Sequence, residues 1–375
     1  MIVKEFLQLR RDRRTLAMMI VLPLLLLVVF GYAASFDVSK IGALVVGPDA
    51  QAFGQRLRAP FSPVSVHPGE GMAAARNALR DGQADVAFVT GGTRTVALVN
   101  GADLFTARAA ETAVARLAAT QLNAQTLLAQ IQAELPQGVS LSVVTPKPPK
   151  VEVLFNPGLK TAVVMVPGLA GVILVFVGTL IASLGVVRER QAGTLEQLAV
   201  MPLSPWDVLI GKIAPYFLVG AVDLAIVLGA GMLLFGVPMR GSWALLVLGA
   251  LLFLFVTLSL GVLVSSVSQN QGQAMQLAML TVLPQILLSG LIFPLSSMAA
   301  GVRWISYILP LTYFIQISRG VMLQGQTIGD LWRPFVFLAV LGAVVVTAAT
   351  LRFARLLAPA PPGRALRAGA GEGRA

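Results

Sequence analysis

Long apolar segments constrain this chain more than any other feature of its sequence. A helix needs about 20 apolar residues to cross the hydrocarbon core of a bilayer. Six segments reach that length: 15–34, 161–187, 208–236, 243–267, 273–295 and 333–352. A transmembrane barrel would instead show alternating segments of about 10 residues. Only 12% of the 375 residues are charged, about half the share in soluble proteins. The sequence therefore predicts an α-helical integral membrane protein with six transmembrane helices.

Basic residues flank the first and the last of these segments. They are Lys4, Arg10, Arg11, Arg13 and Arg14 before the first, and Arg352, Arg355, Arg364, Arg367 and Arg374 after the last. Such residues are typical of the cytoplasmic face of a membrane. We therefore expect a cytoplasmic N-terminus (1–14) and a cytoplasmic tail (353–375), whose Pro/Gly/Ala-rich composition predicts disorder. Membrane orientation explains the net charge of +11, and no nucleic-acid partner is expected.

The first apolar segment has a second interpretation, as a cleaved signal peptide. It ends in GYAAS, whose small residues resemble a cleavage site. The apolar run from Leu16 to Ala34 is longer than a usual signal core, and cleavage would remove the agreement between the two basic ends. We therefore expect an uncleaved helix over 15–34.

Residues 35–160 have the mixed composition of a water-soluble domain. Short β-branched runs bounded by Gly, Pro or Asp are typical of strands. The expected strands are 41–46, 84–89, 95–100 and 139–144, and the expected helices are 71–82 and 103–135. TPKPPK (145–150) is expected to be a stiff linker back to the membrane. The sequence thus predicts an extracytoplasmic α/β domain inserted after the first transmembrane helix.

The segment 302–322 is apolar but does not fit the predicted topology as a further span. A seventh span would place the C-terminal arginines outside, against the positive-inside tendency. Pro310 lies at its centre, and Arg303 and Arg319 lie near its ends. We expect an outer re-entrant or interfacial helix pair, which is tolerated where protein packs around it. An ordinary amphipathic loop helix is the alternative.

Motifs for catalysis and nucleotide binding are missing from the sequence. It has no GxxxxGK[ST] phosphate loop, no HExxH and no GxSxG elbow. It has no cysteine and only one histidine, His67. We therefore expect no catalytic residue, no metal site and no cofactor in this chain.

Asp223 is the one ionisable residue that lies clearly in the middle of a predicted span. Ionisable groups inside membranes are candidates for function, so Asp223 could serve as a proton carrier in an intramembrane polar site. A carboxyl group that is hydrogen-bonded across a helix contact is the structural alternative.

A charged segment, RERQAGTLEQLAVMPLSP (188–205), separates the second and third predicted spans on the cytoplasmic side. It reads as a short amphipathic helix that begins at Gly193 and the N-cap Thr194 and ends at Pro202 and Pro205. The polar residues are Glu189, Arg190 and Glu196, and the apolar ones are Leu195, Leu198 and Met201. Such a helix could dock onto a partner, or it could be an ordinary solvated loop helix.

Three stretches of the sequence resemble the permease subunits of type-2 ABC exporters (ABC-2 permeases). They are LFNPGLKTAVVMVPGLAGVIL (154–174), RERQAGTLEQLAVMPLSPWDVLIGKIAPY (188–216) and the stretch from PQILLSGLIFPLSSM to PLTYFIQISRGVMLQG (284–325). The RER-x-x-GT-x-E-x-L pattern is the most specific of these features. Gln191 departs from it, because relatives commonly have an acidic residue there.

The resemblance implies a dimer of two permeases, identical or paralogous, each docked to a cytosolic ABC ATPase subunit that binds the ATP. The segment 188–206 would then be the coupling helix, carried by Glu189, Arg190, Gly193, Thr194, Glu196, Leu198 and Pro202. In relatives with an outer domain of this size, that domain often meets a periplasmic adaptor protein. The implied location is the bacterial inner membrane, and the implied activity is export of a hydrophobic or amphipathic compound.

Two other functions remain open at the level of the sequence. One is an ion-coupled secondary transporter that uses Asp223. The other is a membrane scaffold or sensor whose outer domain binds a ligand without transport.

Overall fold

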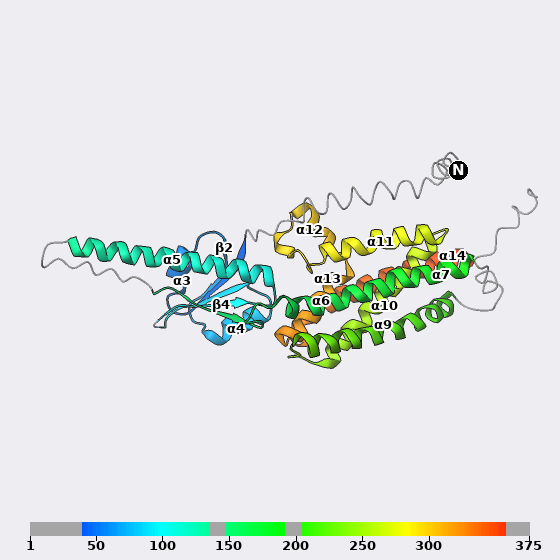
Figure 1. The fold of residues 1–375 in the computed structure, drawn as a ribbon, viewed down its shortest axis with the longest axis horizontal. Coiled ribbons are helices and arrows are strands. Elements are labelled where there is room, and N and C mark those ends of the chain that lie inside the picture. The colour runs from blue at the N-terminus through cyan, green and yellow to red at the C-terminus, as the bar shows by residue number, and fades with distance from the viewer. Residues whose placement is uncertain (1–39, 93, 135–146, 192–204, 358–375) are drawn as a thin grey trace, which may run out of the picture.

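The computed structural model of this protein describes residues 40–92, 94–134, 147–191 and 205–357. These residues form two parts, an α/β region and a bundle of long helices, which lie end to end (Figure 1). The predicted span 15–34, the N-terminus 1–14 and the tail beyond residue 357 lie outside the described residues, as do Gly193, Thr194, Glu196, Leu198 and Pro202.

The α/β region is built on one mixed five-stranded sheet of order β2-β1-β3-β4-β5. Strand β1 pairs in parallel with both β2 and β3, β3 and β4 form an antiparallel pair, and β4 pairs in parallel with β5. The elements are β1 (Ile41–Val46), α3 (Ala50–Arg56), β2 (Phe61–His67), α4 (Met72–Arg80), β3 (Val86–Val89), β4 (Val96–Asn100), α5 (Leu104–Glu134) and β5 (Lys150–Leu154).

Alternating side chains of the strands explain why helices cover both faces of the sheet. Ile41, Ala43 and Val45 of β1 belong to a cluster that includes Ala107 and Ala110 of α5. The next residues along the strand, such as Leu44 and Val46, belong to a second cluster with α4. This period of two is the pattern of a strand that is buried on both faces.

The sequence predicts part of this sheet correctly. The expected strands over 41–46, 84–89 and 95–100 correspond to β1, β3 and β4, and the expected helices correspond to α4 and α5. The expected strand 139–144 lies outside the described residues. The linker prediction for TPKPPK (145–150) is wrong at its end, because Lys150 begins strand β5 and hydrogen-bonds into the sheet.

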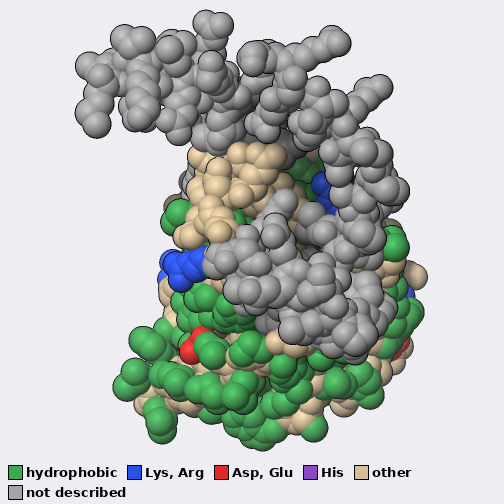
Figure 2. Space-filling view, turned by 90° about the vertical axis from the view of Figure 1, so that its right-hand side faces the viewer, with side chains coloured by type: hydrophobic (Ala, Val, Ile, Leu, Met, Phe, Trp, Pro, Cys, Tyr) green, Lys and Arg blue, Asp and Glu red, His purple; other side chains and the backbone are tan. Residues whose placement is uncertain are grey.

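The helix bundle contains most of the remaining described residues. Its elements are α6 (Thr161–Val175), η1 (Phe176–Ile181), α7 (Ala182–Gln191), α9 (Pro205–Phe235), α10 (Trp243–Val267), α11 (Gln271–Leu288), η2 (Leu295–Ser297), α12 (Ala300–Ser306), α13 (Pro310–Arg319), η3 (Gly320–Gln324) and α14 (Ile328–Leu357). Viewed from the end remote from the α/β region, hydrophobic side chains cover most of its described surface (Figure 2).

Four helices in the described part of the chain are long and apolar enough to cross a membrane. They are Thr161–Arg188, Ile213–Phe235, Trp243–Val267 and Ile328–Arg352, and they overlap the predicted spans 161–187, 208–236, 243–267 and 333–352.

The predicted span 273–295 differs from the structure. Helix α11 ends at Leu288 because Gly290 adopts a left-handed backbone (φ 88°), and the 3₁₀ turn η2 follows Pro294. Glutamines in its first two turns also make α11 more polar than the four spans above. The count of six transmembrane helices therefore stays a prediction.

The segment predicted over 302–322 forms a helix pair in the structure, α12 and α13. Pro310 is the first residue of α13, where a proline costs no backbone hydrogen bond. Two hydrogen bonds join the helices across the break: Thr312 Oγ1 donates to the Ser306 carbonyl at 2.7 Å, and the Tyr313 hydroxyl donates to the Tyr307 carbonyl at 2.6 Å. Helix α13 is buried among α6, α10 and α14. Its depth in a membrane stays a prediction.

A contact between two glycines brings the π-helical turn η1 close to α10. A Cβ atom at Gly261 would overlap the carbonyl oxygen of Gly178, and one at Gly178 would overlap Thr257. Thr179 Oγ1 also donates to the Thr257 carbonyl at 3.4 Å. Small residues allow membrane helices to approach closely, so these glycines fix the crossing of the two helices.

Replacing Gly261 by leucine should therefore destabilise the bundle by about 3 kcal/mol, since a large side chain forced into a packed contact costs this much. The measurement is the melting temperature of the purified protein in detergent. Gly229→Leu on α9 is the matched control, because a Cβ at Gly229 meets no atom within 4 Å. An equal loss in both variants would contradict the close crossing.

Candidate functional site

The predicted coupling segment emerges at the end of the bundle remote from the α/β region. Glu189 and Arg190 lie in the last turn of α7, and the structure describes only their backbone. Helix α7 ends there, α9 begins there, and α10 and α11 join there (Figure 1). The side-chain amide of Gln271 donates to Gln191 Oε1 at 2.9 Å. Gln191 thus binds the start of α11.

Asp223 lies on α9, the least buried of the four candidate spans. Only 22% of the apolar window of α9 is buried, against 61% for α10. Val222 and Ile226 beside Asp223 are exposed. No hydrogen bond or ion pair joins Asp223 to another residue that the structure describes. The prediction of a hydrogen bond across a helix contact therefore finds no support among the described residues, and the polar-site role of Asp223 stays a prediction.

A hollow in the described structure lies between the α/β region and the bundle. It has a volume of about 480 Å³. Its lining comes from the α4–β3 and β4–α5 connections on one side, and from the α11–η2 turn, α13 and the start of α14 on the other. Its lining includes the polar residues Asp81, Asp85, Asp103, Ser289, Arg319, Gln326 and Asp330. We call this hollow the junction cavity.

The α/β region supplies three aspartates to the junction cavity. Asp85 Oδ2 accepts a hydrogen bond from the Gly42 amide at 2.8 Å. Asp103 Oδ1 accepts from the amides of Phe105 and Thr106 at 3.2 Å each, which caps the start of α5. Asp81 forms an ion pair with Arg80 at 3.1 Å. Burial raises the pKa of Asp85, the Gly42 hydrogen bond opposes this rise, and repulsion from Asp103 adds to it.

The bundle supplies one guanidinium group, that of Arg319 on α13. Its nitrogens donate to three backbone carbonyls: Val164 of α6 at 3.3 Å, Gly290 at 3.3 Å and Leu291 at 3.4 Å. No described acidic residue forms an ion pair with it. Arg319 therefore joins α13 to α6 and to the α11–η2 turn, while its remaining surface lines the cavity.

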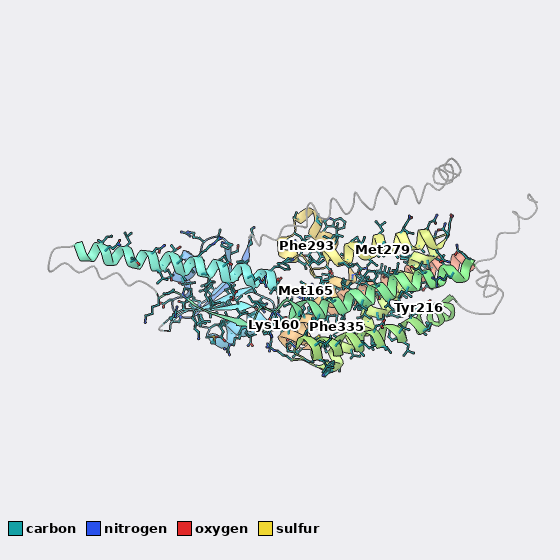
Figure 3. All side chains as sticks on the ribbon, in the orientation of Figure 1. Lys160, Met165, Tyr216, Met279, Phe293 and Phe335 are labelled. Atoms are coloured by element: carbon teal, nitrogen blue, oxygen red, sulfur yellow. The ribbon has the colours of Figure 1, made fainter. Side chains whose placement is uncertain are left out.

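Hydrogen bonds and packing fix the α/β region to the bundle around this cavity. The Gln326 side-chain amide donates to the Arg80 carbonyl. The Asn156 side chain bonds both the amide and the carbonyl of Lys160 at 3.1 Å, where the chain enters α6 (Figure 3). Phe155, at φ 67°, packs under Arg240 at 5.9 Å. The chain thus returns from the sheet to the bundle through a turn with defined contacts.

Arg319 is recognisable in the sequence as a charge in an apolar segment, but the sequence does not reveal the cavity. Asp81, Asp85 and Asp103 looked like ordinary charges of a soluble domain. What these aspartates share is their place in the fold, because each lies next to the end of a strand or helix at the same end of the sheet. That placement is visible only once the sheet order is known.

Asp85→Asn should raise the melting temperature of the protein at neutral pH. The folded state raises the pKa of Asp85, so the protonated form is favoured by folding and the charged form is disfavoured. The stability of the wild type should therefore fall as the pH rises from the ordinary aspartate value through the raised one. Asparagine keeps an acceptor for the Gly42 amide but carries no charge.

The measurement is thermal unfolding of both proteins between pH 4 and pH 8. The advantage of Asp85→Asn should shrink as the pH falls. A constant difference between the variants across this range would show that burial of the charge is not its cause.

The chain is similar to known membrane transport proteins. Residues 13–351 match the family described as ABC-2 family transporter protein. The chain is 35% identical over 173 residues to "Probable multidrug ABC transporter permease YbhS" of Escherichia coli, which is 46% of each chain. It is 31% identical over 245 residues to "Probable multidrug ABC transporter permease YbhR" of the same organism, 64% of each chain.

A third relative is "Inner membrane transport permease YhhJ" of Escherichia coli, 32% identical over 207 residues and 54% of each chain. The matched stretches thus span between about half and two thirds of the length of these relatives. The family match covers nearly the whole chain, from the first predicted span to the end of the last candidate span. This chain is a membrane protein that belongs to the ABC-2 transporter family.

Proposed function

We propose that this chain is the membrane-spanning permease subunit of an ATP-driven exporter of hydrophobic or amphipathic compounds. The observation that carries the proposal is the family match over residues 13–351. The printed names of YbhS and YbhR, multidrug ABC transporter permeases, support the same activity. The four candidate spans support a membrane location.

The energy source in this proposal is a separate cytosolic ABC ATPase, which binds and hydrolyses the ATP. The segment 188–206 docks to it, with Glu189, Arg190, Gly193, Thr194, Glu196, Leu198 and Pro202 as the coupling residues. The site of attachment supports this role. The segment connects helices α7 and α9, and α7 is continuous with η1 and α6. A movement of the segment can therefore be transmitted along this helix to the end of the bundle at the junction cavity.

We propose a dimer of two permeases in the inner membrane, with both termini in the cytoplasm. The exposed apolar side of α9, with Leu218, Val222 and Ile226, supports contact with lipid or with the second subunit. The α/β region then lies outside the cytoplasm. Helix α5 carries exposed Leu122 and Leu127 toward its C-terminal end, a surface on which a periplasmic adaptor could dock.

The experiment that tests the proposal is co-purification with an ABC ATPase encoded beside this gene. A tagged wild-type chain should retain the ATPase in detergent at near equal amounts. Stimulation of ATP hydrolysis by the bound permease would support coupling. Recovery of the chain without any ATPase, under conditions in which the chain stays folded, would contradict it.

Asp223→Asn should leave ATP-driven transport within about twofold of the wild type, a change of less than 0.5 kcal/mol in the barrier. The reason is that Asp223 lies on the weakly buried α9 rather than among the buried groups of the bundle. The measurement is ATP-dependent dye movement in vesicles that hold the complex. Loss of transport in this variant, together with transport driven by a proton gradient alone, would support a secondary transporter instead.

A further inference from the structure

The lining of the junction cavity has a net negative charge, although it includes one guanidinium group. Four carboxylates, those of Asp81, Asp85, Asp103 and Asp330, line the cavity against Arg319. Asp81 is paired with Arg80, which does not line the cavity. The other three carboxylates form no ion pair with a described basic side chain. Arg80 still attracts Asp330, and Arg319 attracts Asp103. Together with Arg80, the group has four carboxylates and two cations, so its net charge stays negative.

The hydrogen bonds that hold the three carboxylates in place come from uncharged donors. Asp85 accepts from the Gly42 amide, Asp103 caps α5, and Asp330 Oδ2 accepts from the amide and hydroxyl of Thr327 at 2.9 Å each. Repulsion from Asp103 contributes to the raised pKa of Asp85, so the two carboxylates interact. A cation between them would relieve this repulsion.

A buried hydroxyl group points independently to a ligand in the cavity. Ser289 lines the cavity and is only 1% exposed, yet its Oγ has no hydrogen-bond partner among the described residues. A buried polar atom without a partner costs about 1–3 kcal/mol. A bound group that hydrogen-bonds Ser289 Oγ would remove this cost.

The chemistry of the cavity selects an organic cation over a metal ion. No three acidic or histidine side chains in the described ranges come close enough together to hold a metal. The volume of about 480 Å³ suits a small organic molecule rather than an ion. Apolar side chains such as Leu295, Ile315 and Leu331 share the lining with the carboxylates.

We propose that the junction cavity binds amphipathic organic cations, with the charged group among Asp85, Asp103 and Asp330 and beside Ser289. This proposal rests on the proposed transport function, because it names the substrate class of the same permease. The cavity lies where the outer ends of the helices meet the α/β region (Figure 1). A cation that leaves the bundle would thus be held before its release.

The experiment compares two probes of nearly equal size and opposite charge, tetraphenylphosphonium and tetraphenylborate. Their binding to the purified full chain in lipid nanodiscs is measured by equilibrium dialysis, with empty nanodiscs as background. The test variant is the triple substitution Asp85→Asn, Asp103→Asn and Asp330→Asn. Each asparagine keeps a hydrogen-bond acceptor for the amides named above, and asparagine caps helices as well as aspartate does.

The control variant carries Asp49→Asn, Glu70→Gln and Glu111→Gln. It has the same change in net charge, but these residues do not line the cavity. The wild type and the control should bind tetraphenylphosphonium equally. The test variant should bind it at least about tenfold more weakly, which corresponds to 1.4 kcal/mol, and should bind tetraphenylborate no more weakly than the wild type does.

Three results would overturn the proposal: no saturable binding of tetraphenylphosphonium by the wild type, unchanged affinity in the test variant, or an equal loss of affinity for both probes. ATP-driven movement of the uncharged dye Nile red by the complex tests the transport function separately. If Nile red is transported and the phosphonium does not bind, only the substrate class is wrong. If the phosphonium binds through the carboxylates and ATP drives no transport, the permease function is wrong and the binding site stands.

Discussion

Arg319→Met should lower the stability of the bundle by about 3 kcal/mol. Arg319 donates to three backbone carbonyls from two other elements. Hydrogen bonds to charged groups contribute about 1.5–3 kcal/mol each. Methionine fills a similar volume but leaves the carbonyls of Gly290 and Leu291 without this donor. Thermal unfolding in detergent measures the loss.

Two further variants separate the hydrogen bonds of Arg319 from its charge. Arg319→Lys keeps the charge but cannot reach three carbonyls with one ammonium group, so it should recover only part of the loss. Arg303→Met on α12 removes a basic residue of the same segment for which no side-chain hydrogen bond to a described residue is present, and it should be close to neutral. A full rescue by lysine, or an equal loss in Arg303→Met, would show that the three hydrogen bonds of Arg319 are not the cause of its effect.

Leu198→Asp should abolish ATP-driven transport and reduce co-purification of the ATPase by at least about tenfold. In the proposed function, Leu198 is an apolar contact of the coupling helix. A charge placed in such a contact costs more than about 2 kcal/mol at an interface hot spot. The double variant Glu189→Ala and Glu196→Ala should weaken both readouts to a smaller extent, because charges at the rim of an interface contribute less.

Leu122→Asp is the matched control for this prediction. It makes the same substitution at a leucine that is 49% exposed on α5, in the α/β region at the opposite end of the molecule. Leu122 lies on the surface proposed for a periplasmic adaptor, so the control is measured with the permease and the ATPase alone. Under these conditions the variant should co-purify with the ATPase and transport as the wild type does. If Leu198→Asp also behaves as the wild type, the segment 188–206 does not carry the coupling.

The parts of the fold that follow from periodicity could be predicted from the sequence. Strands β1, β3 and β4 are short β-branched runs between breakers, and the four candidate spans are long apolar runs. Strand β2 was not predicted because Pro63 interrupts its sequence. Proline is tolerated there because β2 lies at the edge of the sheet. Strand β5 was not predicted because it contains a lysine and a glutamate and follows PKPP, a composition that is typical of a linker.

The junction cavity could not be predicted because it depends on contacts between distant residues. Arg319 binds the Val164 carbonyl, which is 155 positions away in sequence. Asp85 and Asp103 meet only because β3 and β4 form a hairpin whose open end faces the bundle. The extent of α11 had a local cause, the left-handed turn at Gly290. The presence of a glycine did not by itself predict the end of α11, since glycine also occurs inside the apolar helices α10 and α14.

ATP-driven movement of a dye across a membrane tests the permease function most directly. The purified chain and the neighbouring ABC ATPase are reconstituted together into vesicles, and a cationic, a neutral and an anionic fluorescent amphiphile are each followed after addition of ATP. At least one dye should move only with hydrolysable ATP and both proteins present, and this movement should disappear with Leu198→Asp. Movement that persists without ATP or without the ATPase, or no movement of any dye by a complex that hydrolyses ATP, would contradict the account.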